Sequence, residues 1–210
     1  MIDYVVEHNP DDRVLLKASQ ILRNGGLLTF PTETNWVVVA DPFNKAGVDA
    51  LYQLRHVDNT KHFTILCADF KHATEIAYID DGAFRIMKKV SPGPYTFILE
   101  ANKKITKFLK ASKVDKEVGI RFPPRHLARK ILEAHGSVLI STHLTHDMLE
   151  MEDEGVPLYG ALIEDYFGHR IDLILDPGDY DFLGPTSIID FTSGAPEIIR
   201  EGSGDISFLI

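Results

Sequence analysis

Short apolar runs alternate along this chain with segments whose apolar side chains recur at helical spacing. Asp11 or Asp12 can cap a helix that runs to about Arg23, and Asn44 can cap a second helix over 46–54. Two further helices are expected over 83–90 and 127–135, the second ending at Gly136. The apolar runs predict strands at 27–30, 36–40, 63–67, 95–99, 118–122, 138–142 and 171–175.

The end of the chain adds a pair of strands at 187–191 and 197–200, which are close enough in sequence to pair antiparallel. Strands interleaved with helices indicate an α/β fold, and this last pair makes the predicted sheet mixed. The chain has 210 residues, and one domain over residues 1–210 is the expected organisation.

One stretch departs from this pattern. Residues 147–165 hold seven acidic side chains and no Lys or Arg, so a mobile, solvated connection is expected there. The sequence leaves open whether this connection is ordered or closes over a site as a lid.

Composition narrows the class of protein. No segment is apolar over the length needed to span a bilayer, and the first thirteen residues carry four acids, which argues against a signal peptide. Cys67 is the only cysteine, so an intrachain disulfide is excluded. A reducing, cytoplasmic setting is therefore expected, without contact with a membrane.

The net charge of −9 conceals a basic window at 103–130, where ten basic residues face two acidic ones. Local potential of this kind attracts anions such as nucleotides, pyrophosphate or nucleic-acid backbones. A solvated, Lys-rich helix over 105–116 is the alternative reading of the lysines. Arg121 differs, because it lies inside the predicted strand 118–122 and needs a protein carboxylate or a bound anion as its partner.

Several chemical signatures can be tested directly on the sequence. The turn Pro31-Thr32-Glu33-Thr34 sets two hydroxyls and a carboxylate after a strand, which fits either a site wall or ordinary strand-forming residues. His143, His146 and Asp147 lack a third, helix-spaced ligand, so no metal site is predicted. A phosphate loop, a Gly-x-Gly-x-x-Gly turn and a nucleophile elbow are all missing from the sequence.

Six segments, which occur in the same order along the chain as in the YrdC/YciO family, together resemble that family over nearly the whole chain. Residues 55–70 and 84–99 are most similar to the YciO branch. The segments are Gly26 to Thr34, Tyr52 to Arg55, Ser91 to Phe97, Val118 to Pro123, Leu139 to Thr142 and Pro185 to Asp190.

The resemblance implies a twisted, mixed α/β domain with flanking helices and a large concave basic groove. Best understood in this family are the L-threonylcarbamoyladenylate synthases, which convert ATP, L-threonine and bicarbonate to threonylcarbamoyl-AMP and pyrophosphate for tRNA modification. Some members are described as binding double-stranded RNA or tRNA. The resemblance thus predicts ATP, L-threonine and RNA as partners, no tightly bound cofactor, and Mg²⁺ only together with ATP.

Roles for individual residues follow from the same resemblance. Nucleotide or phosphate contacts are predicted for Arg55, Lys61, Thr96, Thr142 and Arg200. Substrate contacts are predicted for Thr32, Thr34, Trp36, Arg121, Ser141, Thr186 and Ser187. The basic window supplies RNA-contact candidates at Lys103, Lys104, Lys107 and Arg125. No catalytic residue is assigned. Alternatively, Thr96, Ser141 and Thr142 are ordinary strand residues, and Arg200 belongs to a surface ion pair worth little.

Three departures from the synthase pattern fall on the expected groove. Gln53 stands where synthases carry a lysine, Trp36-Val37 replaces Tyr-Gly, and His143-Leu144-Thr145 replaces Ser-x-Asn. Two hypotheses remain: a synthase of weak or altered activity, and a non-catalytic protein that binds double-stranded RNA, tRNA or ribosomal RNA.

Overall fold

A mixed sheet organises the fold of the computed structural model, which describes residues 1–55, 63–107, 116–149, 151, 156–178 and 180–209. Within these residues, ten strands lie in the order β1-β8-β2-β3-β7-β4-β6-β5-β9-β10. The strands are β1 Ile2–Tyr4, β2 Leu28–Pro31, β3 Trp36–Ala40, β4 Thr64–Leu66, β5 Tyr95–Glu100, β6 Glu117–Arg121, β7 Leu139–His143, β8 Leu173–Asp176, β9 Ser187–Asp190 and β10 Glu197–Arg200. Parallel and antiparallel pairs both occur, which confirms the predicted mixed α/β architecture.

Helices pack against the sheet, and the first two begin at the capping residues predicted from the sequence. The helices are α1 Asp12–Arg23, α2 Lys45–Leu54, α3 Phe70–Thr74, α4 Asp81–Val90, α5 Lys103–Thr106, α7 His126–His135 and α8 Gly160–Phe167, with short 3-10 turns η1 His146–Leu149 and η2 Ser207–Leu209. The Asp11 carboxylate accepts from the Arg13 amide, and Asn44 accepts from the amides of Ala46 and Gly47. Gly136 ends α7 at φ 72°, a left-handed conformation that glycine adopts without strain.

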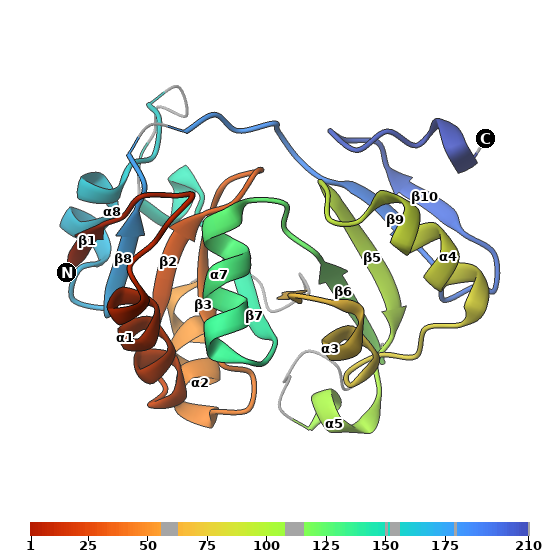
Figure 1. Ribbon diagram of the computed structural model, residues 1–210, viewed down its shortest axis with the longest axis horizontal. Coiled ribbons are helices and arrows are strands. Elements are labelled where there is room, and N and C mark those ends of the chain that lie inside the picture. The colour runs from red at the N-terminus through yellow and green to blue at the C-terminus, as the bar shows by residue number, and fades with distance from the viewer. Residues whose placement is uncertain (56–62, 108–115, 150, 152–155, 179, 210) are drawn as a thin grey trace.

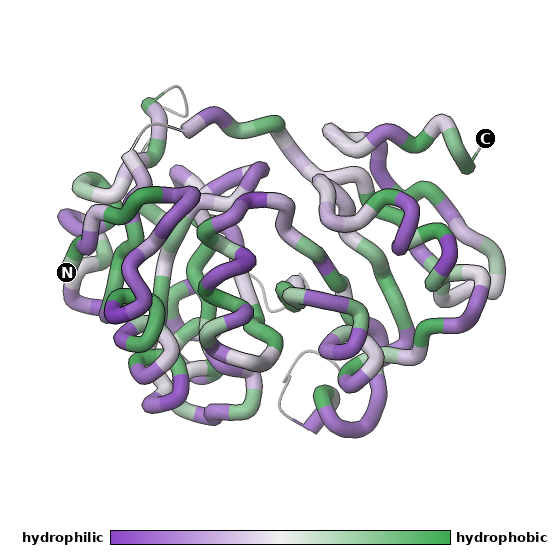
Figure 2. The backbone as a smooth tube through the Cα atoms, viewed as in Figure 1, coloured by the Kyte–Doolittle hydropathy of each residue, from purple (hydrophilic) through white to green (hydrophobic). Residues whose placement is uncertain are grey.

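Two cores lie on opposite faces of β3. Its alternate residues Val37 and Val39 pack with the apolar sides of α1 and α7, whereas Trp36, Val38 and Ala40 belong to the larger core. In Figure 2 the hydrophobic colour follows the strands and alternates with hydrophilic colour along the helices. Burial on both faces explains why β3 reads as a continuous apolar run rather than an alternating one.

The short strand β4 joins two groups of strands. It pairs antiparallel with β7 and parallel with β6, and Thr64 is the register partner of both Ser141 and Gly119. Figure 1 shows β8, β2, β3 and β7 with α1, α2, α7 and α8 on one side, and β6, β5, β9 and β10 with α3, α4 and α5 on the other. This junction is where the candidate site lies.

Most predicted elements are confirmed, with end shifts of a few residues. The antiparallel pairing of β9 and β10 is confirmed as well. Of the Lys-rich helix considered over 105–116, the structure describes only the beginning: α5 begins at Lys103 and ends at Thr106, and 108–115 lie outside the described residues.

Among the described elements, β1, α3, α8 and the 3-10 turns η1 and η2 were not predicted. Helix α8 begins at Gly160, within the acidic stretch 147–165 where a solvated connection was expected, and ends beyond it at Phe167. Its buried side chains Ile163 and Phe167 are four residues apart and therefore share one face, which outweighs the nearby acids. Throughout the described ranges, no helix is long and apolar enough to cross a membrane.

Candidate functional site

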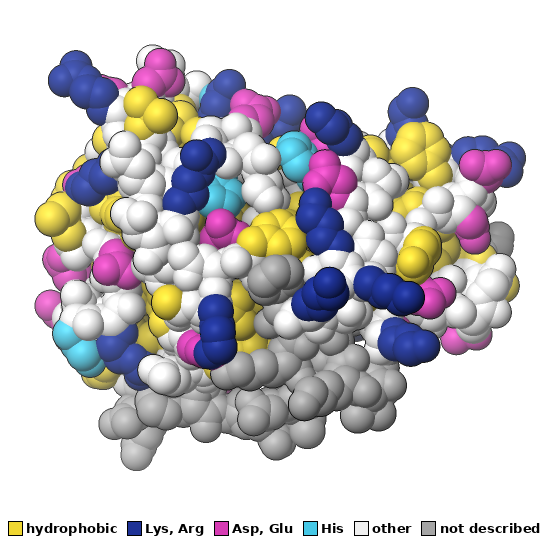
Figure 3. All heavy atoms as spheres, turned by 90° about the horizontal axis from the view of Figure 1, so that it is seen from below, with side chains coloured by type: hydrophobic (Ala, Val, Ile, Leu, Met, Phe, Trp, Pro, Cys, Tyr) yellow, Lys and Arg dark blue, Asp and Glu magenta, His cyan; other side chains and the backbone are white. Residues whose placement is uncertain are grey.

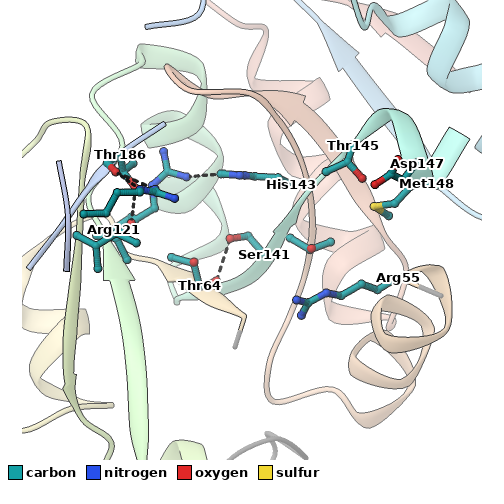
Figure 4. A pocket seen from close by; sticks show the side chains of 13 residues that line it. Arg55, Thr64, Arg121, Ser141, His143, Thr145, Asp147, Met148 and Thr186 are labelled. Atoms are coloured by element: carbon teal, nitrogen blue, oxygen red, sulfur yellow. Dashed lines mark hydrogen bonds between the residues drawn. The ribbon is translucent and has the colours of Figure 1, made fainter. Parts of the chain in front are cut away.

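A pocket of about 470 Å³ lies at the β4 junction, between the two groups of strands. Strands β4, β5, β6, β7, β9 and β10 contribute to it, together with the end of α2 and the turn η1 (Figure 4). It is lined by Arg55, Thr64, Thr96, Arg121, Ser141, Thr142, His143, Thr145, Asp147, Met148, Thr186, Ile188 and Arg200. The lining is thus rich in hydroxyls and arginines and poor in carboxylates.

Hydroxyl groups form the polar part of the wall. The Ser141 hydroxyl donates to the Thr64 carbonyl oxygen at 2.8 Å, since the two residues are register partners on adjacent strands. The hydroxyl oxygens of Thr96 and Thr186 lie 2.8 Å apart, and either can be the donor. A hydroxyl both donates and accepts, so this wall can meet either kind of polar ligand atom.

Arg121 is almost fully buried, at 1% exposure, and its guanidinium is held by three neighbours. Nη2 donates to the Glu33 carboxylate and, at 2.9 Å, to the Thr34 hydroxyl. Nη1 donates to Nε2 of His143 at 2.9 Å. The sequence left a protein carboxylate and a bound anion open as partners, and the structure supplies the carboxylate of Glu33.

The state of His143 follows from this contact. A guanidinium has no acceptor, so Nε2 of His143 must accept, and a neutral ring then carries its proton on Nδ1. Burial, followed by the charges of Arg121 and Arg200, lowers the pKa of His143 from 6.5 to about 4. Because the folded-state pKa is depressed, this group destabilises the fold as the pH falls from about 6.5 towards 4.

Two further arginines stand on different sides of the pocket. Arg200 donates through Nε and Nη2 to the Thr186 carbonyl at 2.9 and 2.8 Å, and through Nη2 to the Thr186 hydroxyl at 3.1 Å. Arg55 follows α2, where its guanidinium lies 4.7 Å from the centroid of the Phe63 ring, and burial lowers its pKa. Figure 4 shows Arg55 well away from Arg121 and Thr186, with Ser141 and His143 between them.

The structure brings seven of the predicted nucleotide or substrate residues into one lining. They are Arg55, Thr96, Arg121, Ser141, Thr142, Thr186 and Arg200. Lys61 lies outside the described residues.

Three other predicted residues are buried but outside the lining. Thr32 donates to the Asn35 carbonyl at 2.9 Å, Thr34 accepts from Arg121, and Ser187 donates to the Gly204 carbonyl at 2.7 Å. Thr32 and Thr34 shape the turn that carries Glu33. Thr34 therefore acts on the pocket through Arg121, and Thr32 acts through its contact with the Thr34 hydroxyl.

Trp36 was predicted as a substrate contact, but it lies in the larger core and does not line the pocket. Its indole N–H donates to the Leu158 carbonyl at 2.9 Å and also contacts the Tyr180 hydroxyl. The sequence places Trp36 close to the Thr32–Thr34 turn along the chain, but the alternation of side chains along β3 turns it to the core.

Sequence reasoning missed part of the wall, namely Thr64, Asp147, Met148 and Ile188, whereas His143 and Thr145 were placed on the groove only as departures from the synthase pattern. Thr64 is recognisable only from its register with Ser141, and Ile188 only from its register with Thr96. Among the described residues, no group of three or more His, Cys, Asp or Glu is placed to hold a metal. His146 instead contacts the Val156 carbonyl at 2.7 Å.

The predicted RNA-contact residues are not equally available. Lys104 pairs with Glu75 at 2.7 Å, and Arg125 pairs with Glu7 at 3.0 Å and donates to the Asp181 carbonyl at 2.6 Å. Lys103 and Lys107 are exposed. Figure 3 shows Lys and Arg side chains interspersed with Asp and Glu over the described part of the face seen from below. Pairing of this kind weakens the positive potential expected from the sequence.

Comparison with known proteins places this geometry in a family. The Sua5/YciO/YrdC family model, described as "Telomere recombination", matches residues 20–202. The uncharacterized protein YciO of Escherichia coli K12 is 32% identical over 208 residues, which is 97% of this chain and 96% of YciO. The crystal structure of E. coli YciO matches with a TM-score of 0.85 at 30% identity, covering 100% of this chain and 99% of that chain.

More distant relatives carry functional names. A threonylcarbamoyl-AMP synthase of Idiomarina loihiensis is 25% identical over 170 residues, 79% of this chain and 87% of the synthase. The structure of P. abyssi Sua5 complexed with L-threonine has a TM-score of 0.82 at 22% identity and shares the fold over 96% of this chain and 57% of that chain. From the family model and the similarity to YciO along almost the entire sequence, the chain belongs to the Sua5/YciO/YrdC family.

Proposed function

We propose that the pocket binds ATP and L-threonine and supports a weak or altered threonylcarbamoyl-AMP synthase reaction. One observation carries this proposal: Arg55 lies across the pocket from Thr186, to which Arg200 donates, and the intervening wall is lined by hydroxyls. The reaction is suggested by the I. loihiensis synthase, and the amino acid by the L-threonine complex of P. abyssi Sua5.

The chemistry suits such a wall. The amine of L-threonine combines with bicarbonate, with loss of water, to give a carbamate. A carbamate oxygen then attacks the α-phosphorus of ATP, and the bond to pyrophosphate breaks. Phosphoryl chemistry of this kind depends on positioning and on positive charge rather than on a protein nucleophile. Mg²⁺ enters the proposal only as the partner of ATP.

Three features argue for reduced activity. The charge of Arg121 is already compensated by Glu33, so its attraction for a substrate carboxylate is smaller than that of a free guanidinium. Gln53 also carries no charge where synthases have a lysine, and Thr145 stands in the place of their asparagine. Ligand binding is therefore expected to persist better than turnover.

The direct test is to incubate the purified protein with ATP, Mg²⁺, L-threonine and bicarbonate and to measure pyrophosphate and the adenylate. We expect slow, threonine-dependent product. Arg55→Ala and Arg200→Ala are each expected to weaken ATP binding about tenfold or more, since a hydrogen bond to a charged group contributes about 1.5–3 kcal/mol. Arg129→Ala, on an exposed part of α7, is the matched control. The synthase proposal is excluded by the absence of threonine-dependent product at high enzyme concentration.

RNA binding is the alternative proposal, and the exposure of Lys103 and Lys107 is the observation that favours it. We expect Lys103→Ala with Lys107→Ala to weaken binding of a double-stranded RNA and to flatten its salt dependence, because each phosphate contact releases counterions. Lys104→Ala should have a smaller effect, since Lys104 is paired with Glu75. Equal affinity of the double variant and the unaltered protein at low salt would remove this alternative.

A further inference from the structure

The His143 ring has two chemically different sides. Nε2 accepts from Arg121 at 2.9 Å, whereas Nδ1 has no hydrogen-bond partner among the described residues. Nδ1 is not among the fully buried polar atoms that lack a partner, so it keeps some solvent accessibility, and His143 lines the pocket. Since the neutral ring carries its proton on Nδ1, a residue of the pocket lining holds an N–H donor without an acceptor among the described residues.

In its described part, the lining that includes His143 carries three arginines and one carboxylate, that of Asp147. Arg121 is compensated by Glu33, but Arg200 forms no ion pair with a carboxylate among the described residues. Arg200 uses Nε and Nη2 on Thr186, which leaves Nη1 available. Arg200 and His143 both line the pocket, and the charge of Arg200 contributes to the lowered pKa of His143.

We propose that His143 is a specificity-determining residue of the pocket. Arg121 fixes its ring as the neutral Nδ1–H tautomer, and this N–H, together with Arg200, selects a ligand oxyanion such as a carboxylate, carbamate or phosphate. An oxyanion can accept from both the Nδ1–H and Arg200, whereas a ligand ammonium group has no acceptor for that N–H and is repelled by the charge of Arg200. This inference shares one assumption with the proposed function, namely that the pocket binds a ligand, and it does not require the synthase reaction.

The first test is direct observation of the ring by NMR in protein labelled with nitrogen-15 histidine. The chain has nine histidines, and the resonances of His143 are those missing from the His143→Asn variant. We expect an Nδ1-protonated neutral ring between about pH 5.5 and 8, where an unperturbed histidine titrates. A proton on Nε2, or a titration midpoint above about 6, would overturn the proposal.

The second test is an NMR titration of the His143 Nδ1–H group with two anions at constant ionic strength. Inorganic phosphate and acetate are titrated separately, because they distinguish a phosphate site from a carboxylate site. A shift of the His143 Nδ1 resonance with either anion is the expected result, and the stronger response identifies the ligand class. The absence of any shift with both anions contradicts the proposal.

Two variants of His143 distinguish the effect of the N–H donor from the effect of the aromatic ring. His143→Asn can keep an N–H near the position of Nδ1, whereas His143→Phe keeps a ring and removes both nitrogens. We expect anion affinity, followed through backbone amide shifts of Ser141 and Thr142, to fall about tenfold in His143→Phe, since loss of one hydrogen bond to a charged group costs about 1.5 kcal/mol or more. His143→Asn should retain most of the affinity, and His8→Asn, at an exposed position, is the control.

The outcomes are distinguishable from those of the synthase assay. Unchanged anion affinity in His143→Phe would overturn the role of His143, whatever the turnover. If His143→Phe does not fold, the tautomer and anion titrations of the unaltered protein still decide the question. A protein with the expected tautomer and anion response but no threonine-dependent product would sink the synthase proposal and leave this one standing.

Discussion

Replacing Glu33 by alanine is expected to lower the free energy of unfolding by about 3–5 kcal/mol, because the charge of Arg121 would then be buried without its carboxylate. Both side chains are nearly inaccessible, at 1% exposure for Arg121 and 4% for Glu33. The remaining contacts of the guanidinium, to Thr34 and to neutral His143, carry no negative charge.

Thermal or denaturant unfolding measures this loss. In a protein of this size, 1 kcal/mol corresponds to a change in Tm of about 2–4 °C. The matched control is Glu133→Ala, which removes a carboxylate from exposed pairs on α7 and should cost less than about 1 kcal/mol. Combining Glu33→Gln with Arg121→Met should recover part of the stability, because it leaves no unpaired buried charge. Equal losses for Glu33→Ala and Glu133→Ala would contradict the buried ion pair.

The second large effect is expected at Trp36. Trp36→Ala should cost about 3–5 kcal/mol, since it removes one of the largest side chains of the core and leaves a cavity. The indole lies edge-on to Tyr180, with the ring centroids 5.4 Å apart and the planes at 81°. Its N–H also satisfies the Leu158 carbonyl.

A milder change separates stability from ligand binding. Trp36→Phe keeps an aromatic ring but removes the N–H donor, so we expect a loss of about 1–3 kcal/mol. Affinity for ATP or L-threonine should stay unchanged, because Trp36 does not line the pocket. Unfolding curves and ligand titrations of the same variant test both expectations. A fall in affinity as large as that of Arg200→Ala, without loss of stability, would restore Trp36 as a substrate contact.

The fold was predicted correctly where the local sequence pattern agrees with the burial that the tertiary structure imposes. The strand Trp36–Ala40 was predicted to the residue, because an apolar run of this length can be buried on both faces of a sheet. Helix α1 was found from its cap at Asp11 and its helical periodicity. By contrast, β1 has three residues and α3 has five, which is too short for a periodic pattern to stand out.

Prediction of the site was limited by long-range contacts. The sequence indicated that Arg121 needs a partner, because a charge in a buried strand cannot remain unpaired. It did not indicate which partner, since Glu33 is 88 residues away along the chain. The role of His143 as the acceptor for Arg121 likewise depends on how β6 and β7 are placed around β4.

The sequence by itself determined the α/β class, the order of most helices and strands, the family resemblance, and the set of arginines and hydroxyls from which the pocket is built. Only the tertiary structure decided that Trp36 belongs to the core, that Glu33 compensates Arg121, and that His143 accepts from Arg121. The physical reason is that caps and periodicity act over a few residues, whereas the burial and pairing of a charge depend on strands brought together from distant parts of the chain.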